Sequence, residues 1–211
     1  MPTLETARTW YVQTDSVHDF EHVERVYRMA ERLATQEGAD LEIVRAAALL
    51  HDAEGTTPGS DTRLDHHLSS AEFAGQVLAG EGWPVERIAA VQHCIRAHRF
   101  RDTREPPATI EAKILFDADK LEVIGAIGVV RVIAYATLAN EPIYVEPSQK
   151  FMETGQEEPG EPHSAYHEYL FKLRKIKDRL YTKTARDLAR SRDDYIAAFF
   201  RTLAAEMRGE L

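Results

Sequence analysis

Several features that are common in proteins are scarce or missing in this 211-residue sequence. Its single cysteine, Cys94, rules out an internal disulfide and a zinc site built on several thiolates. No run reaches the roughly 18 consecutive apolar residues of a membrane helix, and the amino terminus lacks the basic-then-apolar pattern of a secretory signal. We therefore expect a cytoplasmic protein with no membrane partner.

Positively charged residues are also fewer than negatively charged ones. The chain has 26 Lys and Arg residues against 35 Asp and Glu residues, which gives a formal net charge of -9. This balance disfavours polymeric nucleic acid and anionic membranes as partners, because both are polyanions. A small charged substrate stays possible, since the local field of a site need not follow the total charge.

No stretch alternates apolar and polar residues long enough to demand a β-sheet. Apolar residues instead recur every three or four positions, as on the buried face of a helix, and 44% hydrophobic content is enough for one core. The pattern predicts an all-α fold in which Asp40 caps the second helix and the last two helices form a long antiparallel pair. The helices are expected at 19–36, 40–52, 65–78, 85–98, 109–138, 164–181 and 184–207.

One long segment, 140–162, is rich in proline and glutamate and shows no helical pattern. Connections of this kind are usually functional lids or disordered links. The helices that follow it are too few to stand alone, and the sequence contains no internal repeat. We therefore expect a single domain over 1–211, with its core motifs at 18–138 and its C-terminal helices at 164–207.

The doublet His51-Asp52 follows a stretch of apolar residues in ALLHDAEG. An imidazole and a carboxylate are costly to bury unless something satisfies them, and a divalent metal ion would do so. His18 and His22 are four positions apart and would share one face of the first predicted helix. A lone buried histidine is usually just hydrogen-bonded, but these clusters together favour a metal site.

An aspartate from DADKL can complete such a site. Asp117 and Asp119 would lie about 200° apart around a helix, so only one of them can face the ion. Apolar periodicity leaves the choice open, because each is in register with apolar neighbours. Histidine nitrogen combined with carboxylate oxygen suits manganese, iron, cobalt, nickel, zinc or magnesium.

The segments HDFEHVERV, ALLHD, CIRAHRF and DADKLEVIGAIG follow one another in this order. The set resembles the H…HD…D signature of the HD-domain metal-dependent phosphohydrolase superfamily, whose members are all-helical. The similarity to one bacterial branch of small HD hydrolases runs from about His18 to about Glu206. Members of that branch act on nucleotides, with nucleoside triphosphate pyrophosphohydrolase activity described.

The resemblance implies a ligand set. His22 is favoured over His18 because the family's first histidine precedes xxRV, and Asp119 is favoured over Asp117 because Lys-Leu follows it. His18 then becomes a supporting or capping residue. The implied metal ligands are His22, His51, Asp52 and Asp119.

Hydrolysis also needs a base and positive charge. Glu54, two residues after Asp52, is placed to position the attacking water or take its proton, although it could be an ordinary solvated loop residue. His98 falls on an inward helical face and is expected in the substrate pocket or in proton transfer. Residues expected to bind the phosphates are Arg25, Lys120 and Arg96, with Arg99, Arg101 and Arg104 forming a solvated edge.

Further histidines leave the metal count open. Some HD enzymes use extra histidines to hold a second ion, and His66, His67, His93 or His98 could do so here. The simpler alternative for the tandem pair is that one caps a helix and the other is solvated. We expect one ion rather than two.

The sequence thus predicts a metal-dependent phosphohydrolase acting on a nucleotide, first of all by releasing pyrophosphate from a nucleoside triphosphate with water activated by the metal. The alternatives are a nucleoside 5'-monophosphate phosphatase, a phosphodiesterase, and a catalytically idle regulatory protein that binds a nucleotide. A homodimer is possible. The sequence does not indicate the base or the sugar.

Overall fold

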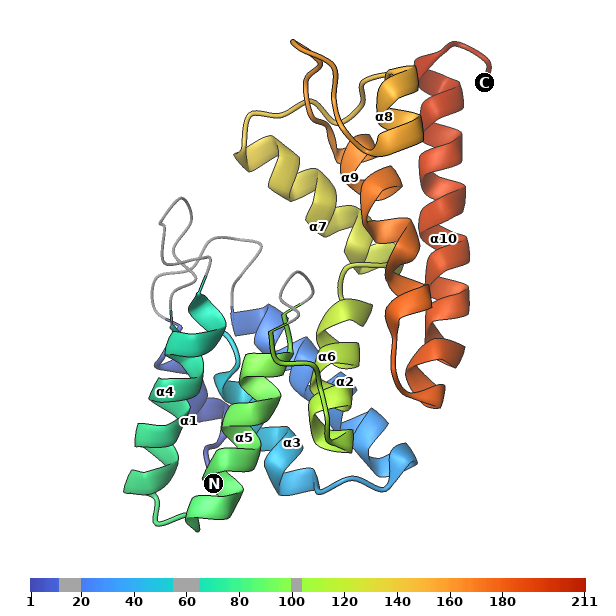
Figure 1. The fold of residues 1–211 in the computed structure, drawn as a ribbon. Coiled ribbons are helices and arrows are strands. Elements are labelled where there is room, and N and C mark those ends of the chain that lie inside the picture. The colour runs from blue at the N-terminus through green and yellow to red at the C-terminus, as the bar shows by residue number, and fades with distance from the viewer. Residues whose placement is uncertain (12–19, 55–64, 100–103) are drawn as a thin grey trace. The chain divides into compact units, whose positions relative to one another are not determined.

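The computed structural model describes residues 1–11, 20–54, 65–99 and 104–211 (Figure 1). These residues form helices and no strand, which confirms the all-α prediction. By its internal contacts the chain divides into two compact units. Unit 1 consists of Met1–Lys120 and Leu180–Ala185, and unit 2 of Leu121–Arg179 and Arg186–Leu211. The single domain over 1–211 stays a prediction.

Unit 1 contains the first helices of the chain, and four of the predicted ones lie within a few residues of their expected bounds. The short helix α1 was not predicted. The observed helices are α1 (Leu4–Arg8), α2 (Phe20–Glu37), α3 (Leu41–Leu50), α4 (His66–Gly80), α5 (Val85–Ala97) and α6 (Ile110–Leu121), whose last residue belongs to unit 2.

Helix α3 is the core of unit 1. Its residues from Ala46 to Leu50 are at most 1% exposed, and α2, α4 and α5 all pack against it. Asp40 caps the helix as predicted, because its carboxylate accepts hydrogen bonds from the backbone N–H groups of Glu42 and Ile43 at 3.0 and 3.2 Å. Arg87 of α5 donates to the same carboxylate at 2.8 and 3.0 Å. The helix is thus fixed at its start and apolar along its length.

The single helix predicted at 109–138 is wrong, because α6 ends at Leu121 and a second helix, α7 (Gly125–Leu138), begins after a break. Gly125 has a φ of +77°, in the left-handed region that favours glycine. A Cβ on Gly128 would lie 2.4 Å from the carbonyl oxygen of Val123. Both glycines are therefore required by the turn itself.

In the described part of the chain no single helix is long and apolar enough to span a membrane; only α6 and α7 taken across their break meet those criteria.

Unit 2 is built on α7 and the C-terminal helices. The predicted C-terminal pair has a broken first member, because α9 (Ala165–Phe171) is followed by the 3-10 helix η2 (Leu173–Arg179) before α10 (Lys183–Met207). The ring of Tyr169 stacks on that of Phe200 at 4.5 Å between centroids. The buried core consists of Val129, Val132, Ala136, Ala165, Leu173, Ile196 and Phe200.

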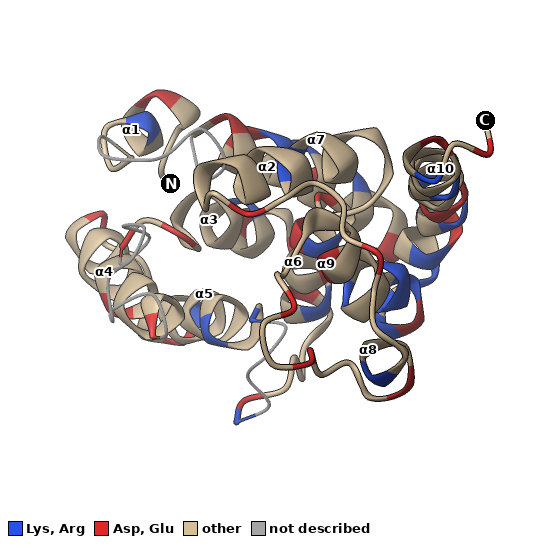
Figure 2. Ribbon diagram, turned by 90° about the horizontal axis from the view of Figure 1, so that it is seen from above, with Lys and Arg blue, Asp and Glu red and all other residues tan. Residues whose placement is uncertain are grey.

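Charged residues of both signs are intermixed along α10 (Figure 2). Arg186, Asp187 and Arg190 follow one another within a single stretch of this helix, and Asp187 pairs with Arg190 at 3.4 Å. This pattern is that of a solvated helix face. The expectation that the chain binds no polymeric nucleic acid stays a prediction.

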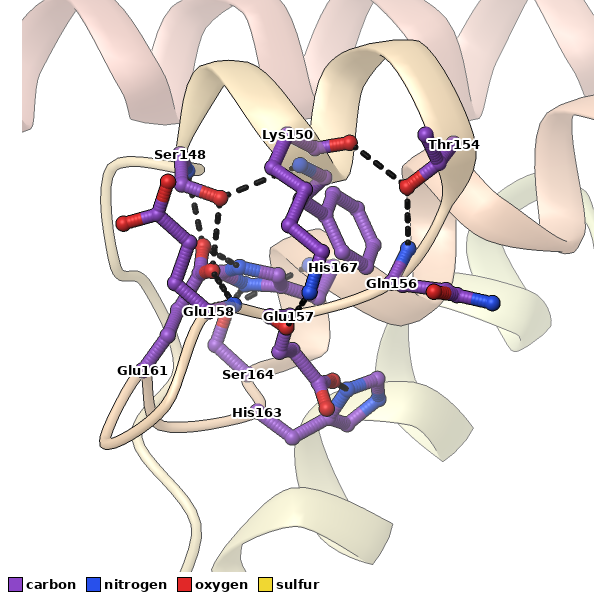
Figure 3. A network of polar contacts seen from close by, with 11 residues as sticks. Ser148, Lys150, Thr154, Gln156, Glu157, Glu158, Glu161, His163, Ser164 and His167 are labelled. Atoms are coloured by element: carbon purple, nitrogen blue, oxygen red, sulfur yellow. Dashed lines mark hydrogen bonds and ion pairs between the residues drawn. The ribbon is translucent and has the colours of Figure 1, made fainter.

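The proline-rich segment 140–162 is a hydrogen-bonded loop that contains a short helix, α8 (Gln149–Thr154). Figure 3 shows Glu161 at the centre of its contacts. The Glu161 carboxylate accepts from the backbone N–H and hydroxyl of Ser148 and from the backbone N–H of Glu158, each at 2.7 Å. It also lies 3.1 Å from Nε2 of the buried His167, whose Nδ1 is 2.6 Å from the hydroxyl of Ser164. One carboxylate thus ties both sides of α8 to the start of α9.

We expect Glu161→Gln to lower the melting temperature of the protein and to raise amide exchange in 140–162. The donors of Ser148 above all hold the pKa of Glu161 down at about 2, so its stabilising effect is complete above its ordinary pKa and is lost as the pH falls toward 2. The difference between wild type and variant, measured by thermal unfolding, should therefore be constant near neutral pH and shrink in acid.

The matched control is Glu153→Gln, which alters an exposed carboxylate on α8 that contacts Gln149. This control should melt like the wild type. Equal melting temperatures for Glu161→Gln and Glu153→Gln would contradict a central role for Glu161 in the loop.

Candidate metal centre

The cluster of His and Asp side chains begins at the C-terminal end of α3, where His51 follows the last helical residue. Its Nδ1 lies 2.8 Å from the backbone carbonyl oxygen of Ala48, and because a carbonyl only accepts, Nδ1 carries the ring proton. Burial lowers the pKa of His51 to about 4, so the ring is neutral at neutral pH. The Nε2 atom of His51 therefore carries a lone pair. Within the described part of the chain this atom makes no hydrogen bond.

The carboxylate of Asp52 lies close to Nε2 of His51. Its Oδ2 atom lies 3.5 Å from Nε2 of His51 and 4.0 Å from Nε2 of His22 on α2. Burial alone would raise the pKa of Asp52, but the surrounding imidazoles, His51 above all, outweigh it and hold the pKa well below its usual range. Asp52 is thus an anion enclosed by histidine rings.

Asp119 reaches the same cluster from the last turn of α6. Its Oδ1 atom lies 3.4 Å from Nε2 of His22, and its other oxygen is paired with Lys120. Burial would raise the pKa of Asp119, but Lys120 and then His22 hold it well below its usual range. His22, His51 and Asp119 each offer one ligand atom, and these atoms all lie within 4.8 Å of one another.

The separations within the cluster fit a shared ion better than direct hydrogen bonds. A hydrogen bond from nitrogen to oxygen spans about 2.7–3.2 Å. Two ligand atoms that are each about 2.1 Å from a metal lie about 3.4 Å apart at the tetrahedral angle. The distances of 3.4 Å from His22 to Asp119 and 3.5 Å from His51 to Asp52 match this value. Imidazole nitrogens together with ionised carboxylates are also the right donor set for a divalent ion.

A second group of ligand atoms gathers at the other oxygen of Asp52. Its Oδ1 atom lies 3.4 Å from Nε2 of His66 and 3.6 Å from Nε2 of His98. His66 is the first residue of α4, and His98 follows the last residue of α5. His98 is buried, as its helical register indicated. Asp52, His66 and His98 satisfy the same distance criterion as the first group.

Three other candidates from the sequence lie outside both groups. Arg96 donates to the carboxylate of Glu105 at 2.6 and 3.0 Å, and His93 lies 2.6 Å from the same carboxylate. His67 is buried beside His66, with 5.7 Å between ring centroids. The structure thus places Arg96 in an ion pair with Glu105 instead of in the cluster.

Asp117 faces away from the cluster, as its spacing from Asp119 requires. It is fully buried and accepts hydrogen bonds from the backbone N–H groups of Tyr181 and Thr182 at 2.9 and 2.7 Å. The hydroxyl of Thr182 donates to it as well, at 2.7 Å. Asp117 therefore anchors the segment 180–185 of unit 1 to α6.

The remaining candidates border the cluster or lie outside the described residues. Glu54 is exposed, and its backbone N–H donates to the hydroxyl of Ser70 on α4 at 3.1 Å. Within the described ranges, no hydrogen bond or ion pair joins the Glu54 carboxylate to the cluster. Arg25 is half-buried on α2, three residues after His22. His18 and Arg101 lie outside the described residues.

Tyr11 stabilises the end of α3 next to the site, and it was not predicted from the sequence. Its hydroxyl donates to the backbone carbonyl of Leu49 at 2.9 Å, one residue beyond the carbonyl that His51 occupies. The side chain is buried, and burial together with the Asp52 charge raises its pKa well above the usual value. Nothing local in the sequence marks Tyr11, because its partner is far away along the chain.

Fold and site together define a helical protein with a His and Asp cluster at the end of its central helix. The model of the HD domain matches residues 19–124, so the chain belongs to the HD-domain family. Membership implies divalent metal binding, and the chain has the His and Asp cluster for it.

The chain is also similar over nearly its full length to individual proteins. It is 35% identical to the Bacillus subtilis protein YpgQ, over 97% of this chain and 94% of that one. The crystal structure of YpgQ in complex with ADP matches with a TM-score of 0.75 at 31% identity, covering 98% of this chain and 99% of that chain. An HD-superfamily hydrolase from Bacillus thuringiensis matches with a TM-score of 0.72 at 25% identity, covering 97% and 94%.

The two aspartates of α6 should behave differently when each is replaced. We expect Asp119→Ala to weaken manganese binding more than the roughly 10–100-fold that follows loss of a group that only orients a ligand. Asp117→Asn should keep manganese binding but destabilise the fold by about 2 kcal/mol, because the amide NH2 group that replaces one carboxylate oxygen would face a buried N–H donor.

Calorimetric titration with manganese and thermal unfolding measure the two properties separately. If Asp117→Asn abolished metal binding while Asp119→Ala retained it, the fourth ligand would be Asp117.

Proposed function

We propose that this chain is a metal-dependent phosphohydrolase that acts on nucleotides, most of all by releasing pyrophosphate from a nucleoside triphosphate. The observation that carries the proposal is the convergence of two imidazole nitrogens and two ionised carboxylates, those of His22, His51, Asp52 and Asp119. When bound there, a divalent ion supplies a Lewis acid for a phosphoryl oxygen and lowers the pKa of a coordinated water toward neutrality.

The protein residues have distinct tasks in this proposal. The bond from His51 to the carbonyl of Ala48 fixes the ring with its lone pair toward the cluster before any ligand arrives. Asp52 and Asp119 stay ionised because of their basic neighbours. This pre-arrangement means that little reorganisation is needed when substrate binds.

Positive side chains at the cluster would hold the phosphates. Lys120 is only 11% exposed and lies beside Asp119, with its ammonium 5.4 Å from the ring centroid of Phe116. Arg25 is on the same face of α2 as His22, one turn further on. We propose that both side chains contact the polyphosphate chain.

The comparison with YpgQ supports a nucleotide. That protein was crystallised with ADP, and it matches this chain from end to end. A base, a ribose and a phosphate chain together are thus compatible with this fold. We propose that this chain binds a nucleotide as well.

We expect metal-depleted protein to be inactive and manganese to restore hydrolysis of nucleoside triphosphates with pyrophosphate as product. The measurement is a nucleotide panel with and without manganese, in which pyrophosphate, phosphate and nucleoside are quantified. His51→Ala should abolish activity and metal binding together.

The products separate the alternatives. Release of free phosphate from a nucleoside 5'-monophosphate would show that the protein is a phosphatase and not a pyrophosphohydrolase. Cleavage of a cyclic nucleotide or a dinucleotide would show that it is a phosphodiesterase. If the metal-loaded protein binds nucleotides but hydrolyses none of them, the chain is a regulatory protein.

We also propose Glu54 as the residue that positions the attacking water. Glu54→Gln should lower kcat by about 100-fold or more, as expected for loss of general base catalysis, and leave the metal content unchanged. The matched control is Glu72→Gln, an exposed glutamate on α4, which should keep full activity. Full activity in Glu54→Gln would mean that Glu54 is a solvated loop residue.

A further inference from the structure

We propose that the outer face of α7 in unit 2 is the contact surface between two copies of this chain, related by a two-fold axis. The surface is a row of apolar side chains that we call the α7 stripe: Ile127, Val130, Ala134 and Leu138. The proposal does not rest on the proposed function, since two copies would associate whether or not the chain hydrolyses nucleotides.

Helix α7 is apolar on two opposite sides. Its inner side contributes Val129, Val132 and Ala136 to the core of unit 2. The α7 stripe lies roughly half a turn away from these residues, and its members recur at intervals of three and four positions. The outer face of a surface helix normally has polar residues. Among its 14 residues α7 has only one charged side chain, that of Arg131, and this composition favours a partner on the outer face.

The exposed area of the stripe fits one side of an interface. Val130, Leu138 and Ile127 are 65%, 57% and 37% exposed, and the neighbouring Tyr135 is 44% exposed. Since a large apolar side chain has roughly 150–250 Å² of surface, these four together expose on the order of 400 Å². One side of a standard interface buries about 800 Å², of which about 60% is apolar. Helix α7 thus provides most of the apolar area that one side of a dimer needs.

Charge favours a second copy of this chain as the partner. Helix α7 contains no Asp or Glu, and Arg131 beside the stripe is positive. Two copies of net charge -9 repel each other overall, so they come together most easily at a face without carboxylates. An anionic membrane would be repelled by the chain as a whole. A strongly basic protein would need an acidic surface, which α7 does not offer.

A two-fold axis suits the pattern of the stripe. In such a dimer both copies contribute the same patch, so the patch must complement itself, and an uncharged apolar stripe does so. With the axis perpendicular to α7, the two helices run antiparallel, and the positive end of each helix dipole lies near the negative end of the other. The small side chain of Ala134, within the stripe, leaves room for larger side chains of the partner helix.

The test begins with the mass of the full chain in solution. Sedimentation equilibrium over a range of protein concentrations should give twice the chain mass of 23.9 kDa. Val130→Glu should weaken the association by about 100-fold or more, because like charges would then lie close together inside the contact. Leu138→Glu should act in the same direction.

A pair of opposite charges tests whether the same patch is used by both copies. Val130→Lys alone should also have the single-chain mass. An equimolar mixture of Val130→Glu and Val130→Lys should regain the dimer, because each contact then joins opposite charges. Regained association would also show that both variants are folded, since misfolded chains would not recover on mixing.

Val85→Glu is the matched control. It makes the same replacement at an even more exposed valine, which is 71% exposed at the start of α5 in unit 1. This variant should keep the mass of a dimer.

Two results would overturn the inference. If the wild type has the single-chain mass at every concentration, the stripe does not join two copies, and flotation with neutral phosphatidylcholine vesicles then shows whether it binds a lipid surface instead. If the dimer persists in both Val130→Glu and Leu138→Glu, the contact lies elsewhere on the chain. Nucleotide hydrolysis is measured separately, so failure of this inference is distinguishable from failure of the proposed function.

Discussion

The site depends on how the buried end of α3 satisfies its backbone carbonyls. A helix leaves its last carbonyl groups without intrahelical partners, and burial makes each one costly if nothing donates to it. Here the ring of His51 donates to Ala48 and the hydroxyl of Tyr11 donates to Leu49. The bond from His51 satisfies a buried backbone carbonyl and at the same time determines which nitrogen of His51 carries the proton. The stability of the core and the orientation of the proposed metal ligand His51 therefore rest on the same contact.

The two aspartates of α6 have different roles: Asp117 stabilises the fold, and Asp119 faces the His and Asp cluster. Asp117 accepts three hydrogen bonds from Tyr181 and Thr182 and so attaches a late segment of the chain to unit 1. Asp119, on the opposite face, meets His22. Because both are on one helix, the bonds of Asp117 also hold the helix that carries Asp119. A buried carboxylate with full hydrogen bonding is thus part of what positions the cluster.

The sequence predicts the features that depend on local pattern and misses those that depend on distant packing. Apolar periodicity placed most helices, and the residues around the doublet indicated a His and Asp cluster. The break at Gly125 was missed because it is flanked by buried apolar residues such as Leu121 and Ile124, so no polar turn marks it. The meeting of His66 with His98 follows from how α4 and α5 are placed in unit 1, and the pairing of Arg96 with Glu105 from how the segment after α5 lies against that helix. Residue spacing contains no such information.

The electrostatics of the cluster are compatible with the anionic substrate that we propose for this negatively charged chain. Long-range attraction scales with total charge and is screened beyond about 8 Å at physiological salt, whereas a partly buried cluster keeps its own field at contact distance. The ring of His51, which burial keeps neutral, adds a lone pair to the site without adding charge. A carboxylate in its place would bind a metal ion as well but would make the site more negative and disfavour a phosphate. Within the described residues the cluster therefore combines histidine rings with two carboxylates, Asp52 and Asp119, and this donor set suits a metal ion that binds phosphate.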